Sequence, residues 1–145
     1  MLYRTFWLGL VILLAPQFSW AHGENIKGPH GGEIRMPGNF HTEVVEDQKG
    51  FRVYLLDFDF TNPTIKDSSV KVVLKTNEAV TELSCTPDRD YFRCLKNGSS
   101  RSPSSTAVSS EIELIAVRDR AAGGKVSYKL PLKFNSAKGP KRVSR

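Results

Sequence analysis

Residues 125–134, KVSYKLPLKF, alternate apolar and polar side chains over the whole stretch. A period of two is typical of a β-strand that has one face on a hydrophobic core and the other in solvent. Pro131 has no N–H to offer a neighbouring strand, so we expect this strand at the edge of its sheet. The apolar positions are Val126, Tyr128, Leu130, Leu132 and Phe134.

Six further short runs have the composition of strands and are separated by turn-forming residues. No stretch has the apolar spacing of an amphipathic helix. About seven short strands with frequent turns predict an all-β protein: a single antiparallel β-sandwich, immunoglobulin-like in broad architecture, with a small barrel as the alternative. The six runs are 41–46, 51–58, 70–76, 80–85, 90–95 and 111–117.

Residues 1–21, MLYRTFWLGLVILLAPQFSWA, have the layout of a secretory signal peptide. Arg4 precedes an apolar run over residues 6–15, and Ala21 ends the stretch with a small side chain. The apolar run is much shorter than the roughly 20 residues that a membrane-spanning helix needs. We therefore expect cleavage after Ala21 and no permanent membrane anchor, with an uncleaved anchor as the alternative. The mature protein would be periplasmic, or else secreted.

The remaining chain is predicted to form one domain, because about 124 residues suffice for one hydrophobic core and are too few for two. We expect a His/Gly-rich segment over 22–40, the β-sandwich over 41–135 and a basic flexible tail over 136–145. The whole chain has a formal net charge of +6, part of which lies in that tail. A basic tail can bind nucleic acid, but an exported protein rarely meets any, so we expect no nucleic-acid partner.

The two cysteines are Cys85 and Cys94, with TPDRDYFR between them. In an oxidising compartment such a pair is typical of a disulfide bond. Turn-forming residues between the cysteines suggest that the bond joins two neighbouring strands. The alternative is a pair of thiolate metal ligands, although the spacing is longer than in zinc knuckles.

All three histidines, His22, His30 and His41, lie near the N-terminus of the predicted mature chain. Imidazole is a common ligand of copper and zinc. Cleavage after Ala21 would give His22 a free α-amine, so that it could chelate a metal through two nitrogens. His30 lies in GPHGG, where the glycines let the backbone turn tightly and leave the ring uncrowded.

Two further side chains in this region could bind a metal. His41 and Glu43 are two residues apart on a predicted strand, so both side chains lie on one face and could point at one ion. Met36 could add a thioether, which favours Cu(I). The candidate metal ligands are therefore His22, His30, Met36, His41 and Glu43.

Each candidate ligand also has an ordinary structural explanation. His22 could simply mark the end of the leader, and His30 could be a solvated turn residue. His41 could be a strand residue hydrogen-bonded to backbone, and Met36 could belong to the core. The spacing of the histidines matches no closed zinc motif.

The stretch GPHGGEIRMPGNFHTEVVED, residues 28–47, followed by GFRVYLLD, resembles the small histidine-containing domain of some periplasmic adaptor subunits of heavy-metal efflux pumps and related stand-alone exported proteins. The shared pattern is proline, histidine and paired glycines, then a strand, a glycine, and a histidine two residues before an acidic residue. The resemblance covers about residues 28–60. It implies a periplasmic domain that binds or presents copper, zinc or a similar cation, with His30, His41 and Glu43 at the matching positions. Those domains often follow a histidine-rich stretch, which is reduced here to His22.

We therefore expect a periplasmic metal-binding protein for copper or zinc, acting as a chaperone, buffer or sensor in heavy-metal homeostasis or efflux. Its partners would be the metal ion and a component of an efflux system. The alternative is an envelope protein-protein interaction or structural domain whose histidines are incidental. A copper oxidase with a histidine brace at His22 is a third hypothesis, but that family typically needs a larger domain with a flat aromatic surface. The sequence lacks serine-hydrolase and phosphate-loop motifs, so we expect no enzyme and no catalytic residues.

Overall fold

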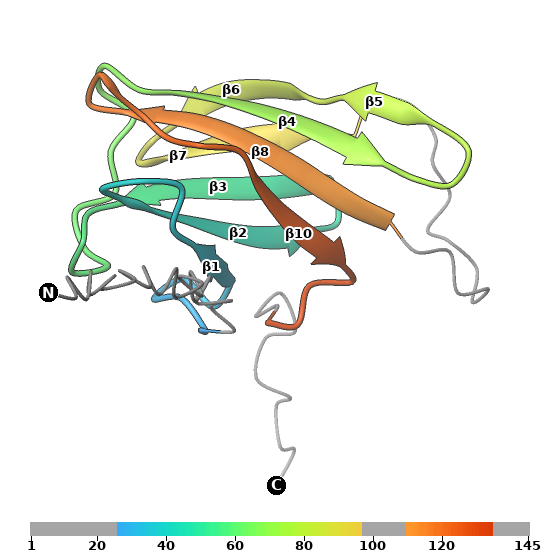
Figure 1. The fold of residues 1–145 in the computed structure, drawn as a ribbon, viewed down its shortest axis with the longest axis horizontal. Helices are drawn as coiled ribbons and strands as arrows, with labels where there is room; N and C mark the ends of the chain where they lie inside the picture. Colours follow the sequence, from blue (N-terminus) through green and yellow to red (C-terminus); the bar gives the residue numbers. More distant parts are fainter. Residues whose placement is uncertain (1–25, 97–109, 135–145) are drawn as a thin grey trace, which may run out of the picture.

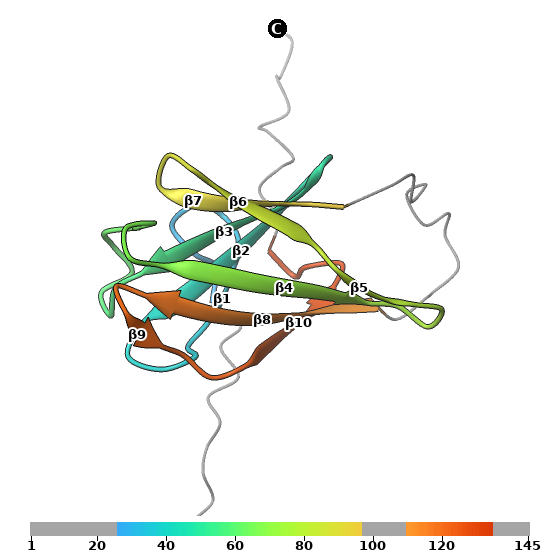
Figure 2. The ribbon, with the colours of Figure 1, turned by 90° about the horizontal axis from the view of Figure 1, so that it is seen from above.

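Two antiparallel β-sheets pack face to face in the computed structural model, which describes residues 26–96 and 110–134 (Figures 1 and 2). The prediction of an all-β sandwich is confirmed. Among the described residues, no helix has the length and apolar character that a bilayer crossing requires. The predicted leader, residues 97–109 and the predicted basic tail lie outside them.

Each sheet is assembled from strands that are distant in the chain. The first sheet has the order β1–β2–β3–β7–β6, and the second has the order β10–β8–β4–β5, with β9 also pairing with β8. The first contains β1 (Glu33–Arg35), β2 (His41–Asp47), β3 (Gly50–Leu56), β7 (Tyr91–Leu95) and β6 (Ser84–Asp88). The second contains β10 (Val126–Leu130), β8 (Ser110–Arg118), β4 (Ser69–Lys75), β5 (Val80–Glu82) and β9 (Ala121–Ala122).

The described residues form ten strands, where the sequence predicts about seven. The predicted strand over 80–85 is in fact two strands, β5 and β6, that belong to different sheets. The chain changes sheet at Leu83, whose side chain is buried and whose N–H donates to the Val72 carbonyl at 2.9 Å. Strands β1 and β9 were not predicted, because runs of two or three residues are too short to show a period.

The N-terminal segment joins the sandwich earlier than predicted. Strand β1 pairs with β2, and Lys27 forms an isolated antiparallel bridge with Glu33. The pairing of β1 therefore begins the first sheet before residue 41, where the sequence places the start of the sandwich.

The edge position predicted from Pro131 is confirmed. Strand β10 lies at the edge of the second sheet and ends at Leu130, one residue before the proline. The predicted strand over 126–134 is therefore shorter, although Leu132 beyond it still packs into the core.

The hydrophobic core has two parts. The larger part fills the space between the sheets, with Phe40, Val44, Val53, Leu114 and Tyr128 among its members. The smaller part lies on the outer face of the first sheet and consists of Val45, Tyr54, Leu56 and Tyr91, with Phe60 packed against it. One face of an antiparallel sheet is commonly solvated. In this protein, part of the outer face of the first sheet is buried as well.

A buried hydroxyl pair joins the two sheets. The Tyr128 hydroxyl on β10 donates to the Thr42 carbonyl on β2 at 2.9 Å and lies 2.6 Å from the Thr42 Oγ1 atom. Both residues have no exposed surface, and burial raises the pKa of the Tyr128 phenol far above its ordinary value. This polar contact within an apolar core fixes the register of one sheet against the other.

Replacing Tyr128 with Phe should lower the free energy of unfolding by about 1–3 kcal/mol, because the buried Thr42 groups lose their partner across the sandwich. The measurement is urea denaturation followed by circular dichroism. Tyr54→Phe is the matched control, since the Tyr54 hydroxyl accepts only a long bond of 3.3 Å from half-exposed Arg52. Equal losses in the two variants would contradict this role for Tyr128.

Cys85 and Cys94 form a disulfide bond, as predicted. The two residues lie directly opposite each other on β6 and β7, so the bond joins neighbouring strands of one sheet. Cys94 is buried in the core between the sheets, and the described residues contain no free cysteine. The disulfide assignment excludes the alternative in which both thiolates bind a metal.

Reducing this bond should lower the free energy of unfolding by about 2–3 kcal/mol, the value expected for closing so short a loop. Thermal denaturation with and without a reductant measures the change. The Cys85→Ala/Cys94→Ala variant should lose similar stability and should no longer respond to the reductant. A reductant effect that persists in the double variant would have another origin.

Candidate metal-binding site

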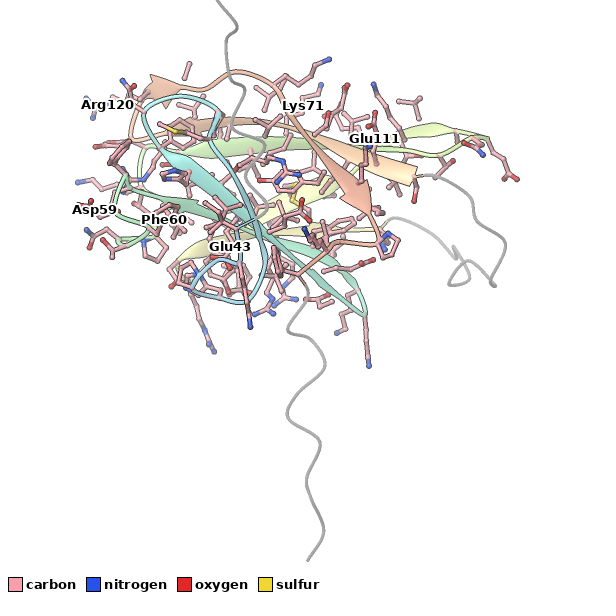
Figure 3. All side chains as sticks on the ribbon, turned by 60° about the horizontal axis from the view of Figure 1, so that its bottom comes forward. Glu43, Asp59, Phe60, Lys71, Glu111 and Arg120 are labelled. Carbon is pink, nitrogen blue, oxygen red and sulfur yellow. A yellow bond between two sulfur atoms is a disulfide. The ribbon has the colours of Figure 1, made fainter. Side chains whose placement is uncertain are left out.

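Glu43 is a fully buried carboxylate on the outer face of β2, beneath the turn formed by residues 28–32 (Figure 3). Its Oε1 atom accepts hydrogen bonds from the backbone N–H groups of His30 at 2.9 Å and Gly32 at 2.8 Å. Its Oε2 atom lies 2.8 Å from Nδ1 of the His30 ring. A buried charge needs such donors, and all three come from a single turn.

Glycines allow that turn to approach Glu43. The N–H of Gly31 donates to the Gly28 carbonyl, and the N–H of Gly28 donates to the Gly32 carbonyl, which is the pattern of a tight hairpin loop. Gly31 has a φ of 86°, a conformation that favours glycine. A Cβ atom on Gly28 would lie 2.2 Å from the Glu43 carboxyl carbon, so any side chain there would collide with the buried group.

The His30 ring is held on two sides. Its Nδ1 atom contacts Glu43, and its face stacks on Tyr54 with 3.8 Å between ring centroids and an interplanar angle of 1°. An ionised carboxylate only accepts hydrogen bonds, so Nδ1 is the ring nitrogen that donates to Glu43 in that state. The neutral ring then has its free lone pair on Nε2, the atom available to a metal. The side chain is 30% exposed, which leaves the ring accessible.

His41 occupies a different environment on the same face of β2. It is buried, and its Nδ1 atom lies 3.0 Å from the Asp57 carbonyl oxygen. The carbonyl can only accept, so Nδ1 carries the proton in this ring too. The ring stacks on Phe60 at 4.2 Å and lies 5.9 Å from Phe58.

The loop after β3 builds the surroundings of His41. The Asp57 carboxylate accepts hydrogen bonds from the backbone of Asp59 and Thr61 and from the side chains of Thr61 and Asn62. These bonds, led by the one from the Thr61 N–H, lower the pKa of the Asp57 carboxyl. The carboxylate thereby organises the loop that brings Phe58 and Phe60 over His41.

The Tyr54 ring is held in place by Tyr91 and by polar side chains of β6 and β7. Its ring lies 5.2 Å from the ring of Tyr91, whose hydroxyl donates to Asp88 at 2.8 Å. That hydrogen bond is the main cause of the lowered pKa of the Asp88 carboxyl, to which Arg93 also donates. The surface on which His30 stacks is therefore fixed by side chains from three strands.

The structure brings together only part of the predicted ligand set. His30 and Glu43 are in contact, whereas His41 faces Asp57 and Met36 is a 40% exposed residue between β1 and β2. His22 lies outside the described residues. Within residues 26–96 and 110–134, no three His, Cys, Asp or Glu side chains form a group that could hold a metal ion. The grouping of His30, His41 and Glu43 around one ion is not seen.

Tyr54 and Phe60 stack on the two described histidines, and neither contact was predicted from the sequence. The sequence could have placed Tyr54 next to Glu43. The turn between β2 and β3 pairs Asp47 with Gly50, and counting outward along the two strands from that pair places Tyr54 opposite Glu43. No comparable signal existed for Phe60. Its position depends on a loop in which it adopts a φ of 62°.

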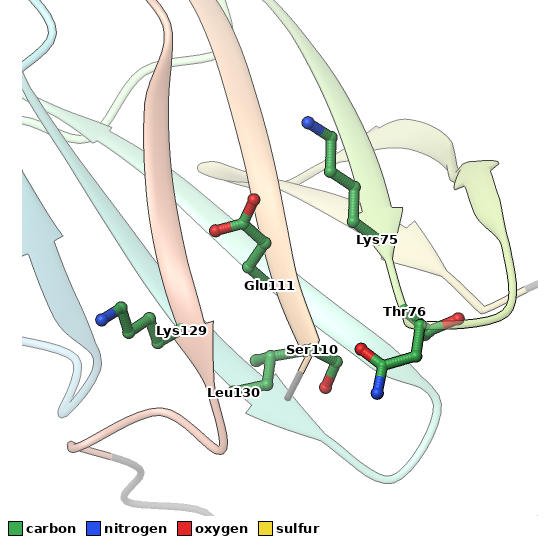
Figure 4. Close-up of a pocket in the computed structure, with 7 residues that line it drawn as sticks. Lys75, Thr76, Ser110, Glu111, Lys129 and Leu130 are labelled. Carbon is green, nitrogen blue, oxygen red and sulfur yellow. The ribbon is translucent and has the colours of Figure 1, made fainter. Parts of the chain in front are cut away.

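A shallow hollow on the second sheet is unrelated to this site (Figure 4). Its surface carries charges of both signs, and Glu111 lies between Lys75 and Lys129. The hollow is far from His30 in the topology, because it lies on the other sheet of the sandwich. Its lining residues are Lys75, Thr76, Asn77, Ser110, Glu111, Lys129 and Leu130.

Comparisons with protein-family models, with curated proteins and with solved structures found no match to this chain.

Replacing Glu43 with Gln should move the ring proton of His30. The amide keeps one oxygen for the two backbone N–H groups and presents an NH₂ group to Nδ1, so the ring should become protonated at Nε2 instead. Long-range ¹H–¹⁵N correlation spectra distinguish the two tautomers. Glu46→Gln, a half-buried position on the opposite face of β2, is the control. An unchanged His30 tautomer in Glu43→Gln would show that Glu43 does not set it.

Proposed function

We propose that this chain is an exported metal-binding protein that holds copper or zinc through Nε2 of His30. The observation that carries the proposal is the 2.8 Å contact between His30 Nδ1 and the buried carboxylate of Glu43. Metal-ligating histidines commonly donate their other ring N–H to a carboxylate, which fixes the tautomer and makes the ring a stronger ligand. In this proposal Glu43 orients the ligand and does not bind the ion itself, because its oxygens already accept three hydrogen bonds.

The site would work by exchange. A single oriented imidazole leaves most of the coordination sphere open, so water or a partner protein completes it. A partner with more or softer donors would then remove the ion. Such exchange is the behaviour expected of a chaperone, buffer or sensor. A closed site, in which protein ligands fill the coordination sphere, would not exchange its metal in this way.

The periplasm and a heavy-metal efflux system are the proposed setting and partner. The leader-like residues 1–21 and the disulfide support export. The link to efflux rests on the resemblance of residues 28–60 to the histidine-containing adaptor domains. The proposal includes no catalytic step.

Protein-protein interaction is the second candidate function, and one observation favours it. Phe58 is 64% exposed beside the His41 pocket. Exposed aromatic side chains are enriched at the centres of protein interfaces. In this alternative the two histidines support the surface around Phe58 without binding a metal.

Calorimetric titration of Zn(II) and Cu(II) into the processed protein tests the proposal. The protein would be expressed with its own leader and recovered after export, and mass spectrometry would report where it begins. We expect binding in the His22→Ala variant and a loss of at least about ten-fold in affinity when His30→Ala is added. His41→Ala should retain binding, because that ring is committed to the aromatic pocket.

Three results would redirect the proposal. Affinity lost with His22→Ala alone would assign binding to the N-terminal chelate and would reopen the histidine-brace hypothesis. Equal losses in His30→Ala and His41→Ala would restore the shared site predicted from the sequence. No binding by the unmodified protein would leave the interaction domain as the better account.

A further inference from the structure

Within the part of the chain that the structure describes, no soft donor contacts the His30 ring. Both cysteines are in the disulfide, and Met36 is the remaining sulfur among the described residues. Met36 is exposed in the connection between β1 and β2, while the contacts of the His30 ring are with Glu43 and Tyr54. Thioethers and thiolates are the donors that favour Cu(I). An ion on His30 would therefore bind an imidazole nitrogen, with no sulfur donor from the described residues among the ring's contacts.

The charge of Glu43 is also unusual for a buried carboxylate. Every other ion pair on the outer face of the first sheet uses an arginine or lysine, as in Asp47 with Arg52 and Arg93. Glu43 instead accepts from two uncharged backbone N–H groups and from a histidine ring. Among the described residues, no lysine or arginine forms an ion pair with it.

A cation on Nε2 would be separated from this carboxylate by the imidazole ring, because Glu43 contacts Nδ1. Coulomb attraction scales with the charge of the ion, so at one position a dication gains twice as much as a monocation. The carboxylate also increases the donor strength of the ring, to which small, highly charged ions respond most. Both effects favour the binding of a dication over that of a monocation.

We propose that the His30 site selects divalent cations such as Zn(II) and Cu(II) over soft monovalent cations such as Cu(I), and that the buried Glu43 carboxylate in contact with Nδ1 is the selecting group. This inference rests on the proposed function, since it requires that His30 binds a metal. It assigns Met36 no part in the site, in contrast to the thioether role predicted from the sequence.

The test compares Zn(II) with Ag(I), a stable probe for soft monovalent ions, in chloride-free buffer. Both are titrated into the processed protein carrying His22→Ala, and free imidazole in the same buffer is the reference. The ratio of Zn(II) to Ag(I) affinity should exceed that of free imidazole by about ten-fold or more. This measurement needs no variant of Glu43.

Variants then identify the selecting group. Glu43→Gln should lower Zn(II) affinity by about 10–100-fold and Ag(I) affinity by less, so the ratio falls towards that of imidazole. Met36→Leu should change neither affinity. Glu46→Gln removes one carboxylate from the other face of the same strand and should leave the ratio unchanged. Near-ultraviolet circular dichroism verifies that each variant keeps the native packing.

Other results would overturn the inference. A ratio of Zn(II) to Ag(I) affinity equal to that of free imidazole would show that the site does not select by charge. Equal losses of Zn(II) and Ag(I) affinity in Glu43→Gln would show that Glu43 is not the selecting group. Ag(I) binding that depends on Met36 would mean that the site is a soft one, although His30 would still be a ligand and the proposed function would stand. Absence of binding by both ions would overturn the proposed function together with this inference.

Discussion

A carboxylate with no exposed surface needs hydrogen-bond donors, and the surroundings of Glu43 follow from that requirement. The donors come from the turn at residues 28–32, so the turn must lie directly on β2. Gly28 has no room for a side chain in this position, and Gly31 takes a conformation that suits glycine. The orientation of His30 then results from the same contacts, because its ring supplies the third donor.

The outer face of the first sheet is consequently a second, small core. Tyr54, Leu56 and Tyr91 are buried there, and the turn over 28–32 and the loop over 57–62 both lie against this face. Both described histidines use it in the same way. Each ring donates Nδ1–H to a fixed oxygen and rests on an aromatic ring, Tyr54 for His30 and Phe60 for His41. In both rings an oxygen from another segment thus contacts Nδ1, which favours the same tautomer.

In the structure the rings of His30 and His41 have different partners, whereas the sequence predicted that both face one ion. Alternation along β2 places His41 and Glu43 on one face, and the structure agrees. Sharing a face does not make two side chains converge, because each turns towards its own partners. Glu43 meets the backbone of the glycine turn, and His41 meets the carbonyl of Asp57, which follows the neighbouring strand. Sequence spacing carries no information about either partner, since both lie on other segments.

The local sequence indicated the positions of most strands, the edge position of β10 and the pairing of the two cysteines. Those features depend on period-two alternation, on the missing N–H of Pro131 and on a short turn between the cysteines. The tertiary structure alone decided that one predicted strand divides between two sheets at Leu83 and that β1 joins the first sheet. It also decided that Glu43 serves His30 as an orienting acceptor. Hydrogen bonds between distant segments form only when packing brings those segments together, so no local pattern can encode them.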